Sequence, residues 1–168
     1  MDTPGENYEL KLPSFRLDGK VALVTGAGTG LGAAISIGLA ESGAEVLLVG
    51  RTQTSLELTS AVIAQRGGRS WAIVCDVTDS AAVRQVIGAL PHLDVLINNA
   101  GTNFPEPFVD VSDEHLDIML DLNVRAAFVV AQAAAQKCSK TQPEPTAPSS
   151  ISRRKWVTSV RRIARFIA

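Results

Sequence analysis

The 168-residue chain is 46% hydrophobic and 20% charged, which is typical of a globular domain and excludes a fibrous or wholly disordered protein. Its two cysteines, Cys75 and Cys138, are far apart and have no histidine pair nearby, so neither a disulfide framework nor a metal site is predicted. The apolar runs are short and the N-terminus is polar. We therefore expect a cytoplasmic protein without a membrane span or export signal.

Charge is divided unevenly along the chain. Residues 1–137 hold 9 Lys and Arg against 16 Asp and Glu, a net charge of −7, whereas residues 138–168 hold 7 against 1, a net charge of +6. Prolines also cluster just after residue 138. We expect a leader over residues 1–17, a folded domain over 18–137, and a basic tail over 138–168 that is either disordered or foreign to the domain.

Within the expected domain, apolar runs alternate with segments of helical periodicity. In chain order the predicted strands are 20–25, 45–49, 70–74 and 93–97, and the predicted helices are 31–41, 52–66, 79–90 and 112–137. Such alternation predicts an α/β fold with a parallel sheet. We expect a Rossmann-type, doubly wound arrangement that is incomplete, with about four strands and their helices.

A glycine-rich turn, TGAGTGLG over residues 25–32, joins the first predicted strand to the first helix. Residues without a Cβ allow unusual dihedral angles and let a pyrophosphate approach the backbone and the helix N-terminus. A glycine cluster alone is also typical of a flexible turn. Its place between a buried strand and a helix favours a dinucleotide-binding site.

The end of the second predicted strand indicates which dinucleotide is preferred. An NAD site usually has a carboxylate there to bind the ribose hydroxyls, but this strand ends at Val49-Gly50-Arg51. A guanidinium can bind a 2′-phosphate through two parallel hydrogen bonds. The sequence therefore favours NADP(H) over NAD(H), although Arg51 could also be an ordinary solvated residue at a helix start.

Four motifs together resemble the short-chain dehydrogenase/reductase family. They are TGAGTGLG at 25–32, Cys75-Asp76-Val77, Asn98-Asn99-Ala100-Gly101, and Asn123 within DLNVRA. The resemblance covers residues 18–137 and looks nearest to the sugar-acid, sorbose and 3-oxoacyl reductase types. It implies reversible hydride transfer between a nicotinamide cofactor and a small-molecule ketone or alcohol.

The resemblance also implies roles for individual residues. Gly26, Gly30 and Gly32 would shape the pyrophosphate turn, and Thr29 and Leu31 would present backbone groups to the cofactor. Asp76 would bind the adenine amino group, with Val77 beside it. Asn99, Ala100 and Gly101 would lie under the nicotinamide ribose, and Asn123 would hold a water of the proton relay. Each of these side chains also has a purely structural interpretation, as a turn former or a helix polar residue.

The family's Ser, Tyr and Lys, which would carry the proton chemistry, have no recognisable counterpart. The only tyrosine is Tyr8, in the leader, and no Tyr-x-x-x-Lys occurs. The resemblance further implies tetramers built through the long helix and the helix that follows it. A homo-oligomer is therefore doubtful for this chain, and catalysis is expected to be incomplete.

A change of reading frame near residue 137 would explain the reversed charge, the proline-rich composition and the missing motif together. If the tail is translated one nucleotide late, the junction of Trp156 and Val157 forces a glycine codon, and that of Phe166 and Ile167 allows only Tyr or His. Among the residues that the junctions allow is the string Asn-[Leu/Ile]-Ser-Ser-Gln-Met-Gly, with a Tyr 13 codons after the second Ser. Codon degeneracy makes this permissive, and an alternative exon would have the same consequence for the protein.

Two other functions stay open. The chain could be a non-catalytic dinucleotide-binding module that regulates an intact relative. The tail could form a basic amphipathic helix, with Trp156, Val160, Ile163 and Ile167 on one face, that binds a membrane or nucleic acid. We consider membrane or nucleic-acid binding less favoured than an accidental tail.

Three further expectations concern single residues and one strand. His92 and His115 are interpreted as isolated surface residues, and Cys75 as a buried thiol. The fourth strand, 93–97, would lose its neighbour beyond the tail junction and become an apolar edge. We therefore expect a poorly soluble or partly molten chain.

Overall fold

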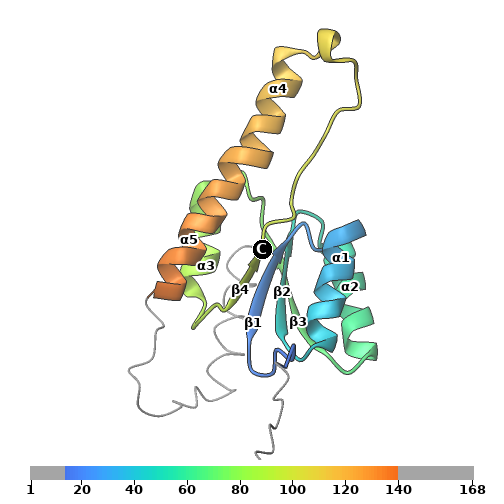
Figure 1. Ribbon diagram of the computed structural model, residues 1–168, viewed down its shortest axis with the longest axis vertical. Helices are drawn as coiled ribbons and strands as arrows, with labels where there is room; N and C mark the ends of the chain where they lie inside the picture. The colour runs from blue at the N-terminus through green and yellow to red at the C-terminus, as the bar shows by residue number, and fades with distance from the viewer. Residues whose placement is uncertain (1–13, 140–168) are drawn as a thin grey trace, which may run out of the picture.

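The computed structural model describes residues 14–139, and it confirms the α/β fold (Figure 1). Four strands form one sheet in the order β3-β2-β1-β4, and every neighbouring pair is parallel. The strands are β1 (Val21–Thr25), β2 (Glu45–Gly50), β3 (Arg69–Val74) and β4 (Val95–Ile97). The predictions for residues 1–13 and 140–168, including the basic helix in the tail, lie outside the described residues.

Helices cover both faces of the sheet, with α1 and α2 on one side and α3 and α5 on the other (Figure 1). They are α1 (Gly30–Glu41), α2 (Gln53–Gln65), α3 (Ser80–Ala89), α4 (Asp113–Leu120) and α5 (Ala127–Ser139). A short 3₁₀ turn, η1 (Phe108–Asp110), precedes α4, and a π-helical segment, η2 (Asp121–Ala126), joins α4 to α5. The two-sided covering explains why the strands are continuous apolar runs.

Successive residues of each strand enter two different cores. Leu23 and Leu47 pack with α3 and α5, in a cluster that includes Val86 and Val130. Their neighbours Val24 and Leu48 point to the opposite face and pack with α1 and α2. The side-chain period of two therefore fills both layers from one short run.

Helix ends follow from local chemistry. The Asp79 carboxylate accepts hydrogen bonds from the amides of Ala81 and Ala82 and caps α3. The Ser112 hydroxyl accepts from the His115 amide and caps α4. Gly43 and Gly67, which follow the ends of α1 and α2, have φ values of 104° and 78° that favour glycine.

Two expectations about the elements were inaccurate. The predicted helix 112–137 is helical throughout but contains η2, where the main chain widens to a π-helix. The predicted strand 93–97 is shorter, because only Val95–Ile97 pair with β1. Within the described residues β4 is an edge strand, as expected.

Candidate functional site

The glycine-rich turn lies at the carboxyl end of β1 and leads into α1. Gly26 and Gly30 have φ values of 64° and 52°, which L side chains rarely adopt. Thr29 is the N-cap residue of α1, but its side chain makes no capping hydrogen bond, and the first turn holds no acidic residue. The N-terminus of α1 is therefore available to an anion such as a diphosphate.

Close packing explains two of the glycines. A Cβ on Gly32 would collide with the carbonyl oxygen of Gly26, and one on Gly26 would lie 2.9 Å from the Asn99 side-chain nitrogen. Gly30 differs, because a Cβ there would meet no atom within 4 Å. Its requirement for glycine comes from its dihedral angle alone.

Thr25 and Asn99 join the turn to the end of β4. The Thr25 hydroxyl accepts hydrogen bonds from the amides of Asn99 and Ala100, both at 3.0 Å. The Asn99 side chain donates to the carbonyl oxygens of Thr25 at 3.1 Å and Gly26 at 3.3 Å. These bonds hold the first and fourth strands' loops against each other.

A pocket opens above the carboxyl ends of the strands and brings most of the predicted residues together. It is lined by Gly26, Thr29, Gly30, Leu31, Gly50, Arg51, Cys75, Asp76, Val77, Asn99, Ala100, Gly101 and Leu122. Ten of the twelve predicted site residues line it. Of the other two, Gly32 packs closely against Gly26 and Asn99, and Asn123 binds Thr102, next to Gly101. A glycine cradle, an uncapped helix N-terminus and a guanidinium fit a dinucleotide's diphosphate and phosphorylated ribose.

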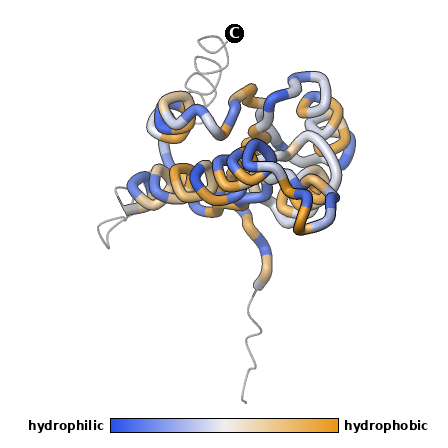
Figure 2. Tube along the Cα trace, turned by 90° about the horizontal axis from the view of Figure 1, so that it is seen from above, coloured by the Kyte–Doolittle hydropathy of each residue, from blue (hydrophilic) through white to orange (hydrophobic). Residues whose placement is uncertain are grey.

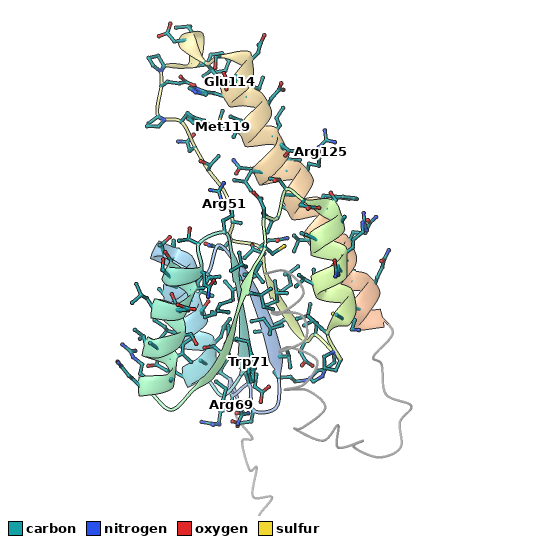
Figure 3. All side chains as sticks on the ribbon, turned by 180° about the vertical axis from the view of Figure 1, so that it is seen from behind. Arg51, Arg69, Trp71, Glu114, Met119 and Arg125 are labelled. Atoms are coloured by element: carbon teal, nitrogen blue, oxygen red, sulfur yellow. The ribbon has the colours of Figure 1, made fainter. Side chains whose placement is uncertain are left out.

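Arg51 and Asp76 lie on the same side of this pocket, at the ends of β2 and β3. Figure 3 shows Arg51 at the carboxyl end of the sheet, opposite Trp71 and Arg69. The hydrogen bond from the Thr78 amide lowers the pKa of Asp76 most; burial opposes it, and the Thr78 hydroxyl and the charge of Arg51 lower the pKa further. Asp76 is therefore an ionised acceptor at neutral pH.

Asn123 lies in η2 and binds the segment that follows the fourth strand. Its side-chain oxygen accepts from the Thr102 amide at 2.9 Å, and its side-chain nitrogen donates to the Thr102 carbonyl at 2.8 Å. Nearby, the Asn98 side chain donates to the Ala127 carbonyl at 3.0 Å. The predicted role of Asn123 in holding water stays a prediction; the structure gives its side chain a clamping role.

Some lining residues were not predicted. Gly50 and Cys75 adjoin predicted residues, and their places at strand ends could have identified them. Leu122 could not have been found, because its place in the pocket depends on η2, which leaves no signal in the periodicity of the sequence. Leu31 is 70% exposed in the pocket wall, an unusual position for a leucine in the first turn of a helix.

Both histidine side chains are partly exposed, but neither is isolated, contrary to the interpretation from the sequence. His115 stacks on Phe104, and its Nδ1 lies 2.8 Å from a carboxylate oxygen of Glu106. His92 is half-buried, with its Nε2 3.5 Å from Asp94. His92 therefore has a partner two residues away, and His115 has partners that sequence spacing does not show.

Cys75 is buried, as expected, and burial raises the pKa of its thiol to about 11, with Asp79 and Asp76 adding to the effect. Within residues 14–139 there is no group of three or more His, Cys, Asp or Glu residues placed to hold a metal ion. The helical run Asp113–Cys138 is long and apolar enough to cross a membrane by length and composition only. Core helices of soluble proteins also meet these criteria, so this is weak evidence for a span.

Comparisons with known proteins identify the family. The short chain dehydrogenase family model matches residues 20–143. Gluconate 5-dehydrogenase of Gluconobacter oxydans is 40% identical over 126 residues, which is 73% of this chain and 49% of that protein. L-xylulose reductase of Bos taurus is 38% identical over 122 residues, covering 73% and 48%.

A solved structure agrees with these relatives. The short chain dehydrogenase of Burkholderia cenocepacia in complex with NADP has a TM-score of 0.67 and 39% identity, covering 73% of this chain and 52% of that one. This chain spans about half the length of the curated relatives it matches. Its glycine turn, its parallel sheet and these matches together show that the chain belongs to the short chain dehydrogenase family.

Proposed function

We propose that this chain binds NADP(H) across the carboxyl ends of its strands, as the cofactor-binding part of an NAD(P)-dependent oxidoreductase of the short-chain type. The observation that carries the proposal is the single pocket lining shared by the glycine turn, Arg51 and the Asn99–Gly101 segment. The relatives named dehydrogenases and reductases, and the NADP complex of a structural neighbour, support it.

Each part of the pocket suits one part of the cofactor. The N-terminus of α1 would bind the diphosphate, and Arg51 would bind the 2′-phosphate through charge-assisted hydrogen bonds. Asp76 would accept from the adenine amino group, and Asn99, Ala100 and Gly101 would border the nicotinamide ribose. When bound, the nicotinamide would supply the hydride that a small-molecule carbonyl accepts, or take one from an alcohol.

Preference for NADP(H) over NAD(H) follows from charge. β2 ends at Gly50 without a carboxylate, and Arg51 follows it directly. A carboxylate in this position would repel a 2′-phosphate, whereas a guanidinium attracts it. We further propose a cytoplasmic location and a small-molecule substrate, as befits an enzyme of this family.

Titration of the full chain with NADPH, followed by its fluorescence, tests the proposal. We expect saturable binding of NADPH and weaker binding of NADH. A parallel assay of NADPH oxidation with ketone substrates separates an enzyme from a non-catalytic binding module. The assay is needed because the sequence contains no Tyr-x-x-x-Lys motif. Absence of binding by either coenzyme would overturn the proposal.

A further inference from the structure

The segment between β4 and α4 runs beside the long helix and is attached to it at two places. Figure 1 shows it rising from the end of β4 and returning as α4. The first attachment is the pair of hydrogen bonds between Asn123 and Thr102. The second lies farther out, where Phe104 and Glu106 of the segment both contact His115 of α4.

This second attachment, the latch of Phe104, Glu106 and His115, has well-defined geometry. The rings of Phe104 and His115 are parallel to within 2°, and their centroids are 3.9 Å apart. The Glu106 carboxylate lies 2.8 Å from His115 Nδ1. The Glu106 amide also donates to the Phe104 carbonyl, and the Ser112 hydroxyl accepts from the His115 amide, so backbone contacts fix both sides of the latch.

Both contacts of the ring are stronger when the imidazole carries a second proton. Two neutral aromatic rings prefer an offset or edge-to-face arrangement with a larger centroid separation, whereas a cation is attracted to the face of a ring. The Glu106 carboxylate then forms an ion pair in place of a neutral hydrogen bond. Solvent screens it only in part, because the side chains of Glu106 and His115 are 22% and 36% exposed.

The charged groups nearest the latch in the chain are all carboxylates. Glu106 is the charged residue in contact with the ring. Other carboxylates precede and follow His115 on the adjoining turn and helix: Asp110, Asp113, Glu114 and Asp117.

The latch is connected to the pocket by neighbouring residues along the chain. Gly101 lines the pocket and is followed directly by Thr102, and Leu122 lines it beside Asn123. We propose that His115 is a positioning residue, which holds residues 102–107 against the long helix and so fixes the nicotinamide end of the pocket, more firmly when the imidazole is protonated. This inference rests on the proposed cofactor site.

Hydrogen exchange of the full, cofactor-free chain tests the latch. Protection factors of the amides of residues 102–104 and 106, corrected for the intrinsic effect of pH, are compared at pH about 6 and about 8, on either side of the ordinary histidine range. We expect about two- to fivefold higher protection at the lower pH, the factor that corresponds to one exposed cation–ring contact. H115A should lose both the protection and its pH dependence.

Matched variants separate the two contacts. H115F keeps a stacked ring without a charge, so it should restore part of the protection at both pH values but none of the pH dependence. E106Q should reduce the pH dependence and keep the stack. H92Q changes the chain's only other histidine and should behave as wild type.

NADPH titration of the same variants links the latch to the site. We expect H115A to raise the Kd for NADPH about two- to fivefold and H115F to recover much of that loss. Equal protection of residues 102–107 in wild type and H115A at both pH values would overturn the inference. If wild type does not bind NADPH, the proposed function fails, and the hydrogen-exchange data still test the latch independently.

Discussion

Arg51 lies at the boundary between β2 and α2 and lines the candidate cofactor pocket. Its guanidinium makes no ion pair with any of residues 14–139, and it influences the nearby Asp76 only through its charge. A charged side chain held at a strand end without a partner is available to a ligand. The proposed preference for NADP(H) therefore depends on this one residue.

Replacing Arg51 with alanine should weaken NADPH binding and leave NADH binding nearly unchanged. Loss of charge-assisted hydrogen bonds worth about 1.5–3 kcal/mol corresponds to about a 10- to 150-fold higher Kd. Fluorescence titration with both coenzymes measures the effect. Arg66→Ala is a suitable control, because Arg66 pairs with Glu41 outside the pocket. An equal loss of NADPH and NADH affinity in R51A would contradict the assignment.

Cys75 gives a pH-dependent prediction at the same scale. The pKa of its thiol is raised from 9.0 to about 11, so the folded state keeps this proton when the unfolded chain has lost it. Stability should therefore fall as the pH rises from 9 toward 11. Denaturant unfolding of wild type and Cys75→Ala over this range measures the effect; the variant should show the shallower decline, and identical slopes would contradict it.

At the scale of the element, α1 shows how one helix serves both packing and binding. Its first residues line the pocket, and two of its later residues, Ser36 and Ala40, are buried. Gly32 and Gly38 both belong to this helix, but only Gly32 is crowded, by the Gly26 carbonyl and the Asn99 side chain. The helix therefore contains its own internal control.

Gly32→Ala should destabilise the chain by about 1–3 kcal/mol, because the added methyl group forces the turn and the helix apart. It should also abolish NADPH binding, since the diphosphate cradle is displaced. Gly38→Ala should be neutral or stabilising by up to about 1 kcal/mol, because nothing lies within 4 Å and alanine favours helices. Chemical denaturation and NADPH titration check both. A stable, NADPH-binding G32A would show that the turn has more room than described.

The π-helical segment η2 is a second example of an element shaped by its surroundings. Asn123 binds Thr102 through both side-chain atoms, and Asn98 binds the carbonyl of Ala127 just after the segment. The widened turn brings Leu122 to the pocket. An unbroken α-helix would place these side chains differently around the axis.

For the whole molecule, the main feature is that the edge strand β4 and one face of the long helix are incompletely covered in the described fold. β4 is an edge strand in the described fold, and its three residues are only half-buried. Hydrophobic residues also alternate with hydrophilic ones along the long helix (Figure 2), and Leu116, Leu120, Val124 and Phe128 are 44–66% exposed. Such surfaces favour association and loose packing.

We expect the full chain to bind a hydrophobic dye and to unfold over a broad temperature range. Changing the exposed Val124 and Phe128 to lysine should raise solubility and preserve the far-ultraviolet circular dichroism. The matched change Val130→Lys places a charge at a position only 1% exposed and should unfold the chain. A sharp two-state thermal transition in a monomeric wild type would contradict the expectation.

The coding DNA supplies a separate test at this scale. A change of frame near residue 137 would replace the sequence that follows α5. Sequencing codons 130–168 should reveal a shifted frame, or an exon junction, that encodes the Ser-Ser-Gln-Met-Gly string and the later Tyr. An unbroken frame without these codons would remove the explanation.

The amino-acid sequence by itself determined the order of strands and helices and the glycine turn. Runs such as Val21–Val24 must be buried on both faces, and a turn made of glycines between a strand and a helix has few other structures. Arg51 was predicted from its place at the end of a strand, and Asp76 and Asn99 from the family resemblance. Their convergence follows because parallel strands end at the same edge.

Only the tertiary structure decided the π-helical segment, the three-residue length of β4 and the surroundings of the histidines. Asn123 reaches Thr102 across 21 residues, and His115 reaches Glu106 across 9. Such contacts depend on the path of the chain between two elements, which hydrophobic periodicity does not record. Local pattern fixes which element forms, and the packing of distant side chains fixes where that element bends and what it touches.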